Sequence, residues 1–436
     1  MNRILGAFVA MMVFALPAQA VDIQEVTSKG GLKAWLVQEP SIPFTALQLR
    51  FRGGAALDRP GKRGSVYLMS GLIEEGAGDL DAREFAAAQE ALAASFSYNA
   101  YDDGLSISAK FLTENRDEAV ALLKLALTQA NFDEDAVARV KSQVLSGISS
   151  DLKDPSKIAG VTFDRLAFGD HPYGSAKEGS PESVAALTRE DVVNAYRDVL
   201  TTERVFIGAV GDISAEELGN LMDDLLGELP VTGASLPGRA DFALGGGVTV
   251  VDYPTPQSVA VFGHQGIKRD DPDFFAAFVM NQILGAGGFG SRLMEEVREK
   301  RGLTYGVSTY LLPMDNAELF LGQVASANDR IGQAMTVIRD EWDKLANQGV
   351  TAEELEDAQK YLTGAYPLRF DGNTSIARIL VGMQEDGLST SYIDTRNARI
   401  NAVTLADIRR VASRLLQPEN LHFVVVGQPK GVEASN

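Results

Sequence analysis

Apolar and polar positions alternate over short stretches of the chain and recur at longer, helical spacing over others. Four short apolar runs have the pattern of β-strands: TALQLRFRGG (45–54), LSISAKFL (105–112), GVTVVDY (247–253) and VAVFGHQG (259–266). The stretches 82–94 and 330–349 have the pattern of amphipathic helices. Strands gathered apart from helices predict an α+β fold, with antiparallel-rich sheets covered by helices.

The two halves of the chain share one pattern. Thr188 and Thr404 each precede an amphipathic stretch with an acidic residue in its first turn, and each stretch leads into an apolar run that ends on a glycine, at Gly211 and Gly427. A threonine in this position predicts a helix N-cap. A second pair of similar stretches, DEDAVARVKSQVLSG and TAEELEDAQKYLTG, recurs at nearly the same offset. We infer an internal duplication, in which each copy is a domain of roughly 200 residues.

The domain boundaries follow from this repeat. We expect a signal peptide at 1–20, an N-terminal domain at 21–228 and a C-terminal domain at 248–436. Between the domains, 229–247 is rich in proline and glycine and interrupts any periodicity. This composition predicts an extended, solvent-exposed linker.

The first residues, MNRILGAFVAMMVFALPAQA, have the organisation of a secretory signal peptide. Arg3 provides the positive end, residues 5–16 an apolar run too short to span a bilayer, and Ala18 and Ala20 a cleavage site, so the mature chain is expected to begin at Val21. No cysteine follows the cleavage site, which excludes a lipoprotein anchor, and the whole chain contains none. We expect the protein in the periplasm of a Gram-negative bacterium.

The charge of the chain narrows the range of partners. Its 40 Lys and Arg against 59 Asp and Glu give a formal charge of −19. Nucleic acids and anionic lipids require clustered basic residues that neutralise phosphate. We therefore expect neither nucleic acid nor a membrane as a partner.

The segment GAGGFGSRLMEEVREKRGLTY (285–305) opens with the letters of a dinucleotide-binding fingerprint, Gly285-x-Gly287-x-x-Gly290. That fingerprint binds a pyrophosphate only where it follows a strand and opens a helix. The preceding stretch, DPDFFAAFVMNQIL, has helical spacing instead. We interpret the glycines as a flexible or tightly turned link between two helices.

Four further stretches carry a family resemblance: FRGGAALDRPGKRG (51–64), DLKDP (151–155), HPYG (171–174) and EEVREKRGLTYGVSTY (295–310). With the duplication and the signal peptide, they make the chain similar to the pitrilysin-type (inverzincin) zinc peptidases, over nearly all of the mature chain. The resemblance is to the short two-domain subunits of the mitochondrial processing peptidase and its bacterial periplasmic heterodimeric relatives. It implies a half-shell of a clam-like chamber in which peptides are cut.

In the catalytic subunits of that family, an H-x-x-E-H helix holds zinc and its Glu activates the metal-bound water. This motif is absent here. The family pattern places Tyr67 and Gly71 at the two His positions, Ser70 at the Glu and Gly147 near the distant Glu ligand. Glycine has no side chain, serine is a poor ligand and a weak base, and a tyrosine phenol stays protonated. The resemblance therefore implies no metal in this chain, with zinc expected in a partner subunit.

The remaining candidates for metal or acid–base chemistry are few. The three histidines, His171, His264 and His422, are too far apart for one helix to carry a pair, so a metal site would need scattered ligands to converge in three dimensions. For His171 we favour a turn residue bonded to backbone over a metal ligand. For Glu74 and Glu75 we favour a solvated helix end over paired catalytic carboxylates, because adjacent residues on a helix do not face one another.

The second-domain element of the family is intact. SRLMEEVREKRG predicts a helix with Arg298 in its last turn, and LTYGVSTYLL predicts a strand that begins near Tyr305. The resemblance implies that the Tyr hydroxyl donates to the substrate carbonyl oxygen as it becomes an oxyanion, while the Arg holds substrate carbonyls. It also implies that the loop glycines Gly287, Gly288 and Gly290 bind substrate.

Two interpretations of the whole chain follow. A missing zinc motif beside an intact Arg–Tyr element favours the non-catalytic subunit of a periplasmic heterodimeric zinc metalloendopeptidase, inactive alone, whose homologous partner carries H-x-x-E-H and whose substrates are peptides. The alternative is a catalytically inactive peptide-binding or structural scaffold of the same fold. Locally, Arg298 could instead pair with Glu295 or Glu296, and Tyr305 could lie in a half-buried strand.

Overall fold

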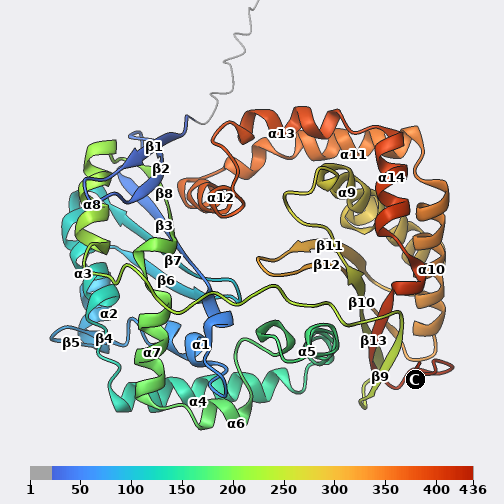
Figure 1. The fold of residues 1–436 in the computed structure, drawn as a ribbon, viewed down its shortest axis with the longest axis horizontal. Helices are drawn as coiled ribbons and strands as arrows, with labels where there is room; N and C mark the ends of the chain where they lie inside the picture. Colours follow the sequence, from blue (N-terminus) through green and yellow to red (C-terminus); the bar gives the residue numbers. More distant parts are fainter. Residues whose placement is uncertain (1–21, 436) are drawn as a thin grey trace, which may run out of the picture.

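Figure 1 shows the fold in a computed structural model that describes residues 22–435. The predicted signal peptide at 1–20 and the expected N-terminus at Val21 lie outside these residues. Two lobes, each built on its own sheet, face each other. Within the described part of the chain, no helix combines the length and apolar character that crossing a membrane requires.

The N-terminal lobe is built on a six-stranded sheet with the order β1-β2-β8-β3-β7-β6. β2 and β8 run parallel, and the other neighbouring strands run antiparallel. The strands are β1 (Gln24–Thr27), β2 (Lys33–Gln38), β3 (Phe44–Arg52), β6 (Ser95–Ala100), β7 (Gly104–Leu112) and β8 (Val205–Gly211).

The C-terminal lobe repeats this topology in a five-stranded sheet with the order β11-β12-β10-β13-β9. Its parallel pair, β9 and β13, stands where β2 and β8 stand in the first sheet, and the other neighbours are again antiparallel. The predicted α+β class and tandem duplication are confirmed. The strands are β9 (Gly247–Asp252), β10 (Gln257–Gln265), β11 (Val307–Pro313), β12 (Glu318–Ala327) and β13 (His422–Gly427).

One face of each sheet is covered by helices of the same lobe. Those of the first lobe are α1 (Ser65–Ser70), α2 (Ala82–Ala91), α3 (Arg116–Thr128), α4 (Glu134–Asp151), α6 (Pro181–Ala185), α7 (Arg189–Val199) and α8 (Ala215–Leu226). Those of the second are α9 (Phe274–Asn281), α10 (Ile331–Gln348), α11 (Ala352–Gly364), α13 (Tyr392–Asn401) and α14 (Leu405–Leu415).

The repeated threonines are the N-caps that the sequence predicted. The Thr188 side chain accepts a hydrogen bond from the backbone of Asp191, whose carboxylate accepts one back from Thr188. Thr404 and Asp407 form the same reciprocal pair at the start of α14. Such capping boxes satisfy backbone donors that a helix N-terminus otherwise leaves unpaired, so four local residues determine where each helix begins.

Each lobe also lends one helix to the other. α5 (Pro155–Phe168) of the first lobe packs on β10 and β13 of the second, and α12 (Asn373–Glu385) of the second packs on β8 and β3 of the first. In Figure 1 these two helices lie between the sheets, below and above the opening between the lobes. The exchange explains why β3 and β13 are almost continuously buried instead of alternating.

The contact of α12 with the first sheet depends on a glycine. Ala377 and Leu380 of α12 form a small core with Ala46 and Val210. A Cβ at Gly208 on β8 would lie 2.8 Å from the carbonyl oxygen of Ala377. Only a residue without a side chain therefore allows the exchanged helix to approach this closely.

Polar groups join the lobes beside these helices. The Tyr173 hydroxyl donates to the carboxylate of Asp103, which also accepts from the backbone N–H of Asp315 at 3.2 Å. Arg52 pairs with Asp315 across the lobes at 2.7 Å. Burial raises the pKa of Asp103 to about 6. These contacts connect the loops of the first sheet to the β11–β12 turn of the second.

The segment that joins the two lobes is extended but not free in solvent. Residues 230–246 form no helix or strand, yet Ala240 is buried, and the backbone N–H of Ala243 donates to Ala167 of α5 at 2.8 Å. Arg239 pairs with the buried carboxylate of Glu318 on β12. Most residues of the segment are exposed, as the sequence predicted, but these contacts anchor it on the exchanged helix α5 and on β12.

Candidate functional site

The four positions of the missing zinc motif converge in space. Tyr67 and Ser70 lie on α1, and Gly71 follows directly, with its backbone N–H bonded to the carbonyl of Tyr67 at 3.4 Å. Gly147 lies on α4, and the four line one cavity of about 510 Å³. The helix turn thus puts positions 67 and 71 on one side, where the family carries its two histidines.

This cavity does not fit a zinc ion. The hydroxyl of Ser70 is buried and donates to the carbonyl of Tyr67 at 2.8 Å, so it is engaged with backbone. The ammonium of Lys177 lies 5.3 Å from the centre of the Tyr67 ring and pairs with Glu178. Within residues 22–435, no group of three or more His, Asp or Glu side chains is placed to hold a metal. The residues at the motif positions are poor ligands, and a cation lies beside them.

The three histidines are each held by nearby groups. His171 caps a short 3₁₀ turn by accepting from the backbone of Tyr173 at 3.2 Å, and its other nitrogen bonds a backbone carbonyl, as a turn residue should. His264 accepts from the Trp342 indole at 3.1 Å, and His422 bonds a threonine hydroxyl and a backbone carbonyl. Burial lowers the pKa of both His264 and His422. Scattered histidines do not converge on a metal.

The adjacent carboxylates Glu74 and Glu75 follow α1 in a turn. Glu75 forms an ion pair with Arg139 of α4, and Glu74 is exposed. An ion-paired carboxylate next to an exposed one is not an acid–base pair, since one member is committed to its cation. This arrangement favours the interpretation of Glu74 and Glu75 as a solvated helix end.

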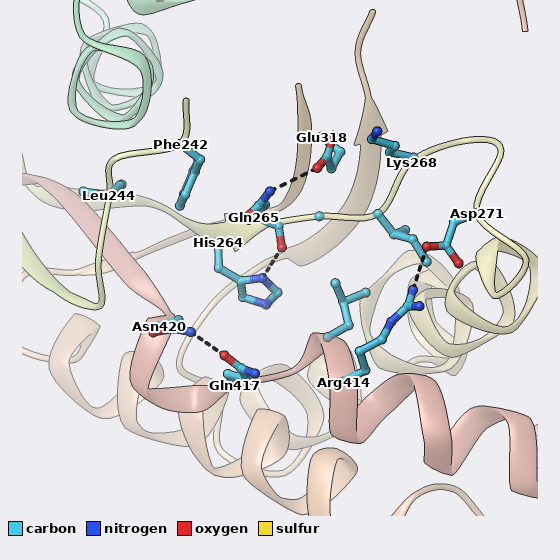
Figure 2. A pocket seen from close by; sticks show the side chains of 13 residues that line it. Phe242, Leu244, His264, Gln265, Lys268, Asp271, Glu318, Arg414, Gln417 and Asn420 are labelled. Atoms are coloured by element: carbon cyan, nitrogen blue, oxygen red, sulfur yellow. Dashed lines mark hydrogen bonds and ion pairs between the residues drawn. The ribbon is translucent and has the colours of Figure 1, made fainter. Parts of the chain in front are cut away.

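The cavity shown in Figure 2, of about 520 Å³, lies among the joining segment, the end of β10 and the end of α14. Several of its polar side chains bond to one another: Arg414 to Asp271 at 3.0 Å and Gln265 to Glu318 at 3.1 Å. The ring of His264 lines it, with Nδ1 bonded to the Gln265 carbonyl at 2.7 Å. The zinc positions, the loop glycines, Arg298 and Tyr305 do not line this cavity.

The glycine segment links two helical turns of an unusual kind. A π-helical turn, Gln282–Ala286, precedes it, and a second, Met294–Glu299, follows it. Gly288 has a φ of 56°, in the left-handed region, and a Cβ at Gly288 or Gly290 would meet no atom within 4 Å. With a helix rather than a strand before it, the segment is not a dinucleotide site, and its backbone is open to another molecule.

Arg298 lies in the second of these turns, where the sequence predicted an ordinary helix. The wider winding shows in the bond from the backbone N–H of Lys300 to the carbonyl of Glu295 at 2.9 Å, five residues back. Arg298 does not pair with Glu295 or Glu296, which bind Lys300 and Arg301. Its guanidinium lies 4.6 Å from the ring centre of Phe289, which is 69% exposed, and contacts Glu299 at 3.5 Å.

Tyr305 projects from a fixed backbone. Its side chain is 85% exposed, so it is not a half-buried strand residue, and β11 begins only at Val307. The hydroxyl of Thr304 accepts from the backbone N–H of Gly306 at 3.0 Å and donates to the carbonyl of Ala325 at 2.6 Å. Neither Tyr305 nor Arg298 lines the cavity at the zinc positions.

Comparison with known proteins agrees with this geometry. Residues 186–362 match the family model described as the peptidase M16 inactive domain. The chain is 26% identical over 430 residues to the non-peptidase homologue YmxG of Helicobacter pylori, with 98% of both chains covered. It superposes on the crystal structure of a peptidase M16 inactive domain from Pseudomonas fluorescens with a TM-score of 0.88 and 28% identity, over 95% of this chain and 99% of that one. Over nearly its whole length, the chain is therefore similar to proteins of the M16 peptidase family.

Two further proteins are similar to this chain. The chain is 25% identical over 424 residues to an uncharacterized zinc protease of Streptomyces coelicolor, covering 95% of this chain and 91% of that protein. A protease from Helicobacter pylori has the same fold, with a TM-score of 0.85 at 16% identity over 93% and 100% of the two chains. The pitrilysin-type resemblance is thus confirmed: the chain is similar to inactive M16 domains, and its zinc positions carry other residues.

Two features of the site correspond to no motif in the sequence. Lys177 beside Tyr67 carried no signal, because the two are more than 100 positions apart and only the fold brings them together. A second, larger cavity next to the zinc positions was missed as well. Its only trace in the sequence is the apolar character of Leu152, Ile158 and Val161, which resembles that of an ordinary helix face.

Proposed function

We propose that this chain is the non-catalytic subunit of a periplasmic heterodimeric zinc metalloendopeptidase. Its partner is a homologous M16 subunit that carries H-x-x-E-H and the zinc, and its substrates are peptides. One contrast carries the proposal: the zinc positions hold residues that cannot bind metal, whereas Tyr305 is 85% exposed on a backbone held by Thr304. Folding normally buries an aromatic side chain. A tyrosine as exposed as Tyr305 is therefore typical of a surface that another molecule covers.

Tyr305 supplies a hydrogen-bond donor. Among the described residues its hydroxyl has no hydrogen-bond partner, which leaves it available to a carbonyl oxygen of a substrate bound in the partner's active site. A donor aimed at an oxygen that gains negative charge stabilises the transition state more than the ground state. The fixed backbone on either side reduces the entropy lost when the ring is positioned.

Arg298 and the glycine segment supply a surface for the peptide backbone. The guanidinium lies over the Phe289 ring and its Nε contacts Glu299, which leaves its terminal N–H groups for substrate carbonyls. Open space above Gly288 and Gly290 lets an extended peptide approach the backbone. These contacts with the peptide backbone would place the scissile bond beside the reacting groups of the partner subunit.

Location and partner are supported by separate observations. The signal-peptide pattern at 1–20 supports export to the periplasm. The match to an inactive M16 domain supports a second M16 subunit, because a chain with no metal ligands needs one to take part in hydrolysis. The alternative, a scaffold that binds peptides without any hydrolysis, requires no such partner.

Reconstitution tests the proposal. Purification of the chain from its native periplasm should recover a homologous subunit with H-x-x-E-H, and intact mass should place the N-terminus at Val21. Peptide cleavage should require both subunits, and the zinc should be found with the partner. One tightly held zinc per chain and cleavage by this protein alone would refute it. A partnerless homodimer that binds peptides without cleaving them would establish the scaffold alternative.

A further inference from the structure

The repeat gives most elements of the first lobe a counterpart in the second. α7 and β8 match α14 and β13, because Thr188 and Thr404 cap the two helices and Gly211 and Gly427 end the two strands. In each lobe, a short 3₁₀ turn joins that helix to that strand. β3 and β10 match in turn, since each pairs antiparallel with that strand. A site that is filled in one lobe therefore has an identifiable counterpart in the other.

In the first lobe, the joining segment fills a groove beside the end of α7. The backbone N–H of Ala234 donates to the carbonyl of Asp198 at 3.3 Å, and the N–H of Glu203 donates to the carbonyl of Val231 at 3.1 Å. Thr201, which lies between α7 and the 3₁₀ turn, is fully buried next to the segment. An extended stretch of backbone thus occupies this groove and bonds to α7 and to the turn that follows it.

The same groove reaches the loop that follows β3. There a Cβ at Gly53 would lie 2.9 Å from a methyl group of Leu236, so this leucine of the joining segment packs closely on the glycine. Gly53 directly follows the last residue of β3, as Gly266 directly follows the last residue of β10. An apolar side chain thus lies at this end of the groove, and Gly266 identifies the matching end in the second lobe.

The counterpart groove in the second lobe is open. It is the cavity of about 520 Å³ in Figure 2, here called the α14 groove, which lies beside the end of α14 and the loop after β10 and is lined by Gly266. Gln417, the counterpart of the buried Thr201, is exposed. The described residues that follow β13 do not line this groove, and the N–H of Ser435 instead donates to the carbonyl of Val248 on β9 at 2.8 Å.

Two backbone groups beside the α14 groove match those that bind the joining segment in the first lobe. Glu419 corresponds to Glu203, and within residues 22–435 its N–H has no hydrogen-bond partner. The carbonyl of Arg414 corresponds to that of Asp198 and is also unpaired among these residues. A continuing helix would supply its donor from position 418, but Pro418 has no N–H. Both groups are available to the backbone of another chain.

The charged side chains of the α14 groove leave one cation unpaired. Arg414 pairs with Asp271 at 3.0 Å, and the buried Glu318 pairs with Arg239. Lys268 lines the groove and forms no ion pair within the described part of the chain. An acidic group that entered the groove would therefore meet a free ammonium.

The rest of the lining combines apolar side chains with exposed amides. The apolar side chains come from the joining segment, the loop after β10 and the end of α14: Phe242, Leu244, Ile267 and Leu415. The amides are those of Gln265, Gln417 and Asn420. An apolar side chain of a ligand is buried on the first set, while polar groups of its backbone meet the second.

We propose that the α14 groove binds an extended segment of a partner protein in which an apolar side chain stands next to an acidic one. The backbone of that segment bonds to the N–H of Glu419 and the carbonyl of Arg414, as the joining segment bonds to the matching groups of the first lobe. Its acidic group pairs with Lys268. A second copy of this chain is disfavoured as the partner, because its joining segment is held in its own first lobe. The proposal is independent of the zinc-bearing partner, since neither Tyr305 nor the zinc positions line this groove.

The test uses the full mature chain and two fluorescein-labelled octapeptides derived from residues 230–237. Their sequences, PVTGAELP and PVTGAQLP, place Glu or Gln at the position of Ser235, next to the leucine. At pH 7.5 the Glu peptide should bind at least about 5-fold more tightly by fluorescence anisotropy, because it alone carries the charge that pairs with Lys268. Lys268→Met keeps a stem of similar length and should reduce that ratio to about one.

Two matched variants test the location. Gln417→Trp should weaken both peptides at least about 10-fold, because an indole at this exposed lining position fills the groove. Gln333→Trp, at an exposed position of α10 outside the groove, should leave both affinities unchanged. Failure of the Glu peptide to bind, equal affinity of the two peptides for the wild-type protein, or binding that survives Gln417→Trp would overturn the proposal. Sedimentation velocity tests the other occupant: a dimer that Gln417→Trp abolishes would assign the groove to a second copy instead.

Discussion

The ammonium group of Lys177 lies 5.3 Å from the centre of the Tyr67 ring, where the family pattern places a zinc-binding histidine. The lysine is held there by its ion pair with Glu178. A neutralised ion pair therefore lies beside the former metal position, and the residues there coordinate a divalent ion poorly. Loss of the metal site thus follows from the residues that replace its ligands.

Restoring the ligands should restore metal binding. The triple variant Tyr67→His, Gly71→His, Gly147→Glu should hold about one zinc per chain after chelation and remetallation, measured by elemental analysis, whereas the wild-type protein should hold none. A Cβ at Gly147 meets no atom within 4 Å, and one at Gly71 meets a methyl group of Val140 at 3.2 Å, which a small shift relieves.

A matched control tests the placement of the fourth position. Replacing Gly147→Glu by Gly160→Glu in the same variant puts the carboxylate in the second cavity instead, so zinc should bind more weakly. Adding Lys177→Ala to the triple variant should tighten binding, because the nearby cation is removed. Equal zinc content with either glutamate would show that Gly147 is not at the ligand position.

Tyr305→Phe should lower turnover of the two-subunit enzyme by about 100-fold or more, since it removes one donor to the oxyanion and little packing. Tyr361→Phe is the matched control, because that tyrosine is also exposed, at 61%, but lies on α11. Peptide cleavage and complex formation should be measured separately. Full activity of the Tyr305→Phe enzyme would assign the side chain a structural role and favour the scaffold alternative.

Arg298→Ala should raise KM and lower kcat of the same complex, because it removes the donors that position the substrate backbone. Arg298→Lys should recover only part of the loss, since an ammonium stacks on Phe289 less well and cannot offer two donors in one plane. Steady-state kinetics with one peptide substrate decides this. If Arg298→Ala changed only the thermal stability of the subunit, substrate positioning by Arg298 would be contradicted.

Gly208→Ala should destabilise the fold by about 1–3 kcal/mol, because a Cβ there lies 2.8 Å from the carbonyl oxygen of Ala377 and the exchanged helix must shift. The same change at Gly160, inside α5 and facing open space, should stabilise the protein by up to about 1 kcal/mol through helix propensity. Urea unfolding of the two variants measures both effects. Equal stabilities would show that α12 does not depend on the glycine.

Asp164→Asn should stabilise the protein at pH 8 and change little at pH 4. The pKa of Asp164 is about 7 in the folded chain, above the ordinary value of about 4 in an unfolded one. As pH rises between these values, only the unfolded state releases the proton, so ionisation favours unfolding by up to about 4 kcal/mol. Thermal unfolding at both pH values checks this, with Asp170→Asn as the control. A variant less stable than the wild type at pH 8 would mean that the carboxylate has a partner.

Several features of the protein follow from the sequence alone, because they depend on residues close together in the chain. Thr188 with Asp191, and Thr404 with Asp407, determine helix starts within one turn, so the duplication and the α+β class were predictable. The absence of histidine at position 67 is a matter of residue identity, and the loss of the zinc motif needed no structure.

Tertiary structure alone decided the rest. Neither periodicity nor spacing predicts that α5 and α12 exchange lobes, since an apolar helix face does not specify which sheet it will cover. The same exchange brings α5 and the joining segment together and places Asp164 at the cavity of about 830 Å³. The contact of Lys177 with Tyr67 joins segments that are far apart in the chain. The exposure of Tyr305 depends on which parts of the fold leave its side chain uncovered. Such long-range packing is set by the whole fold, and no local pattern records it.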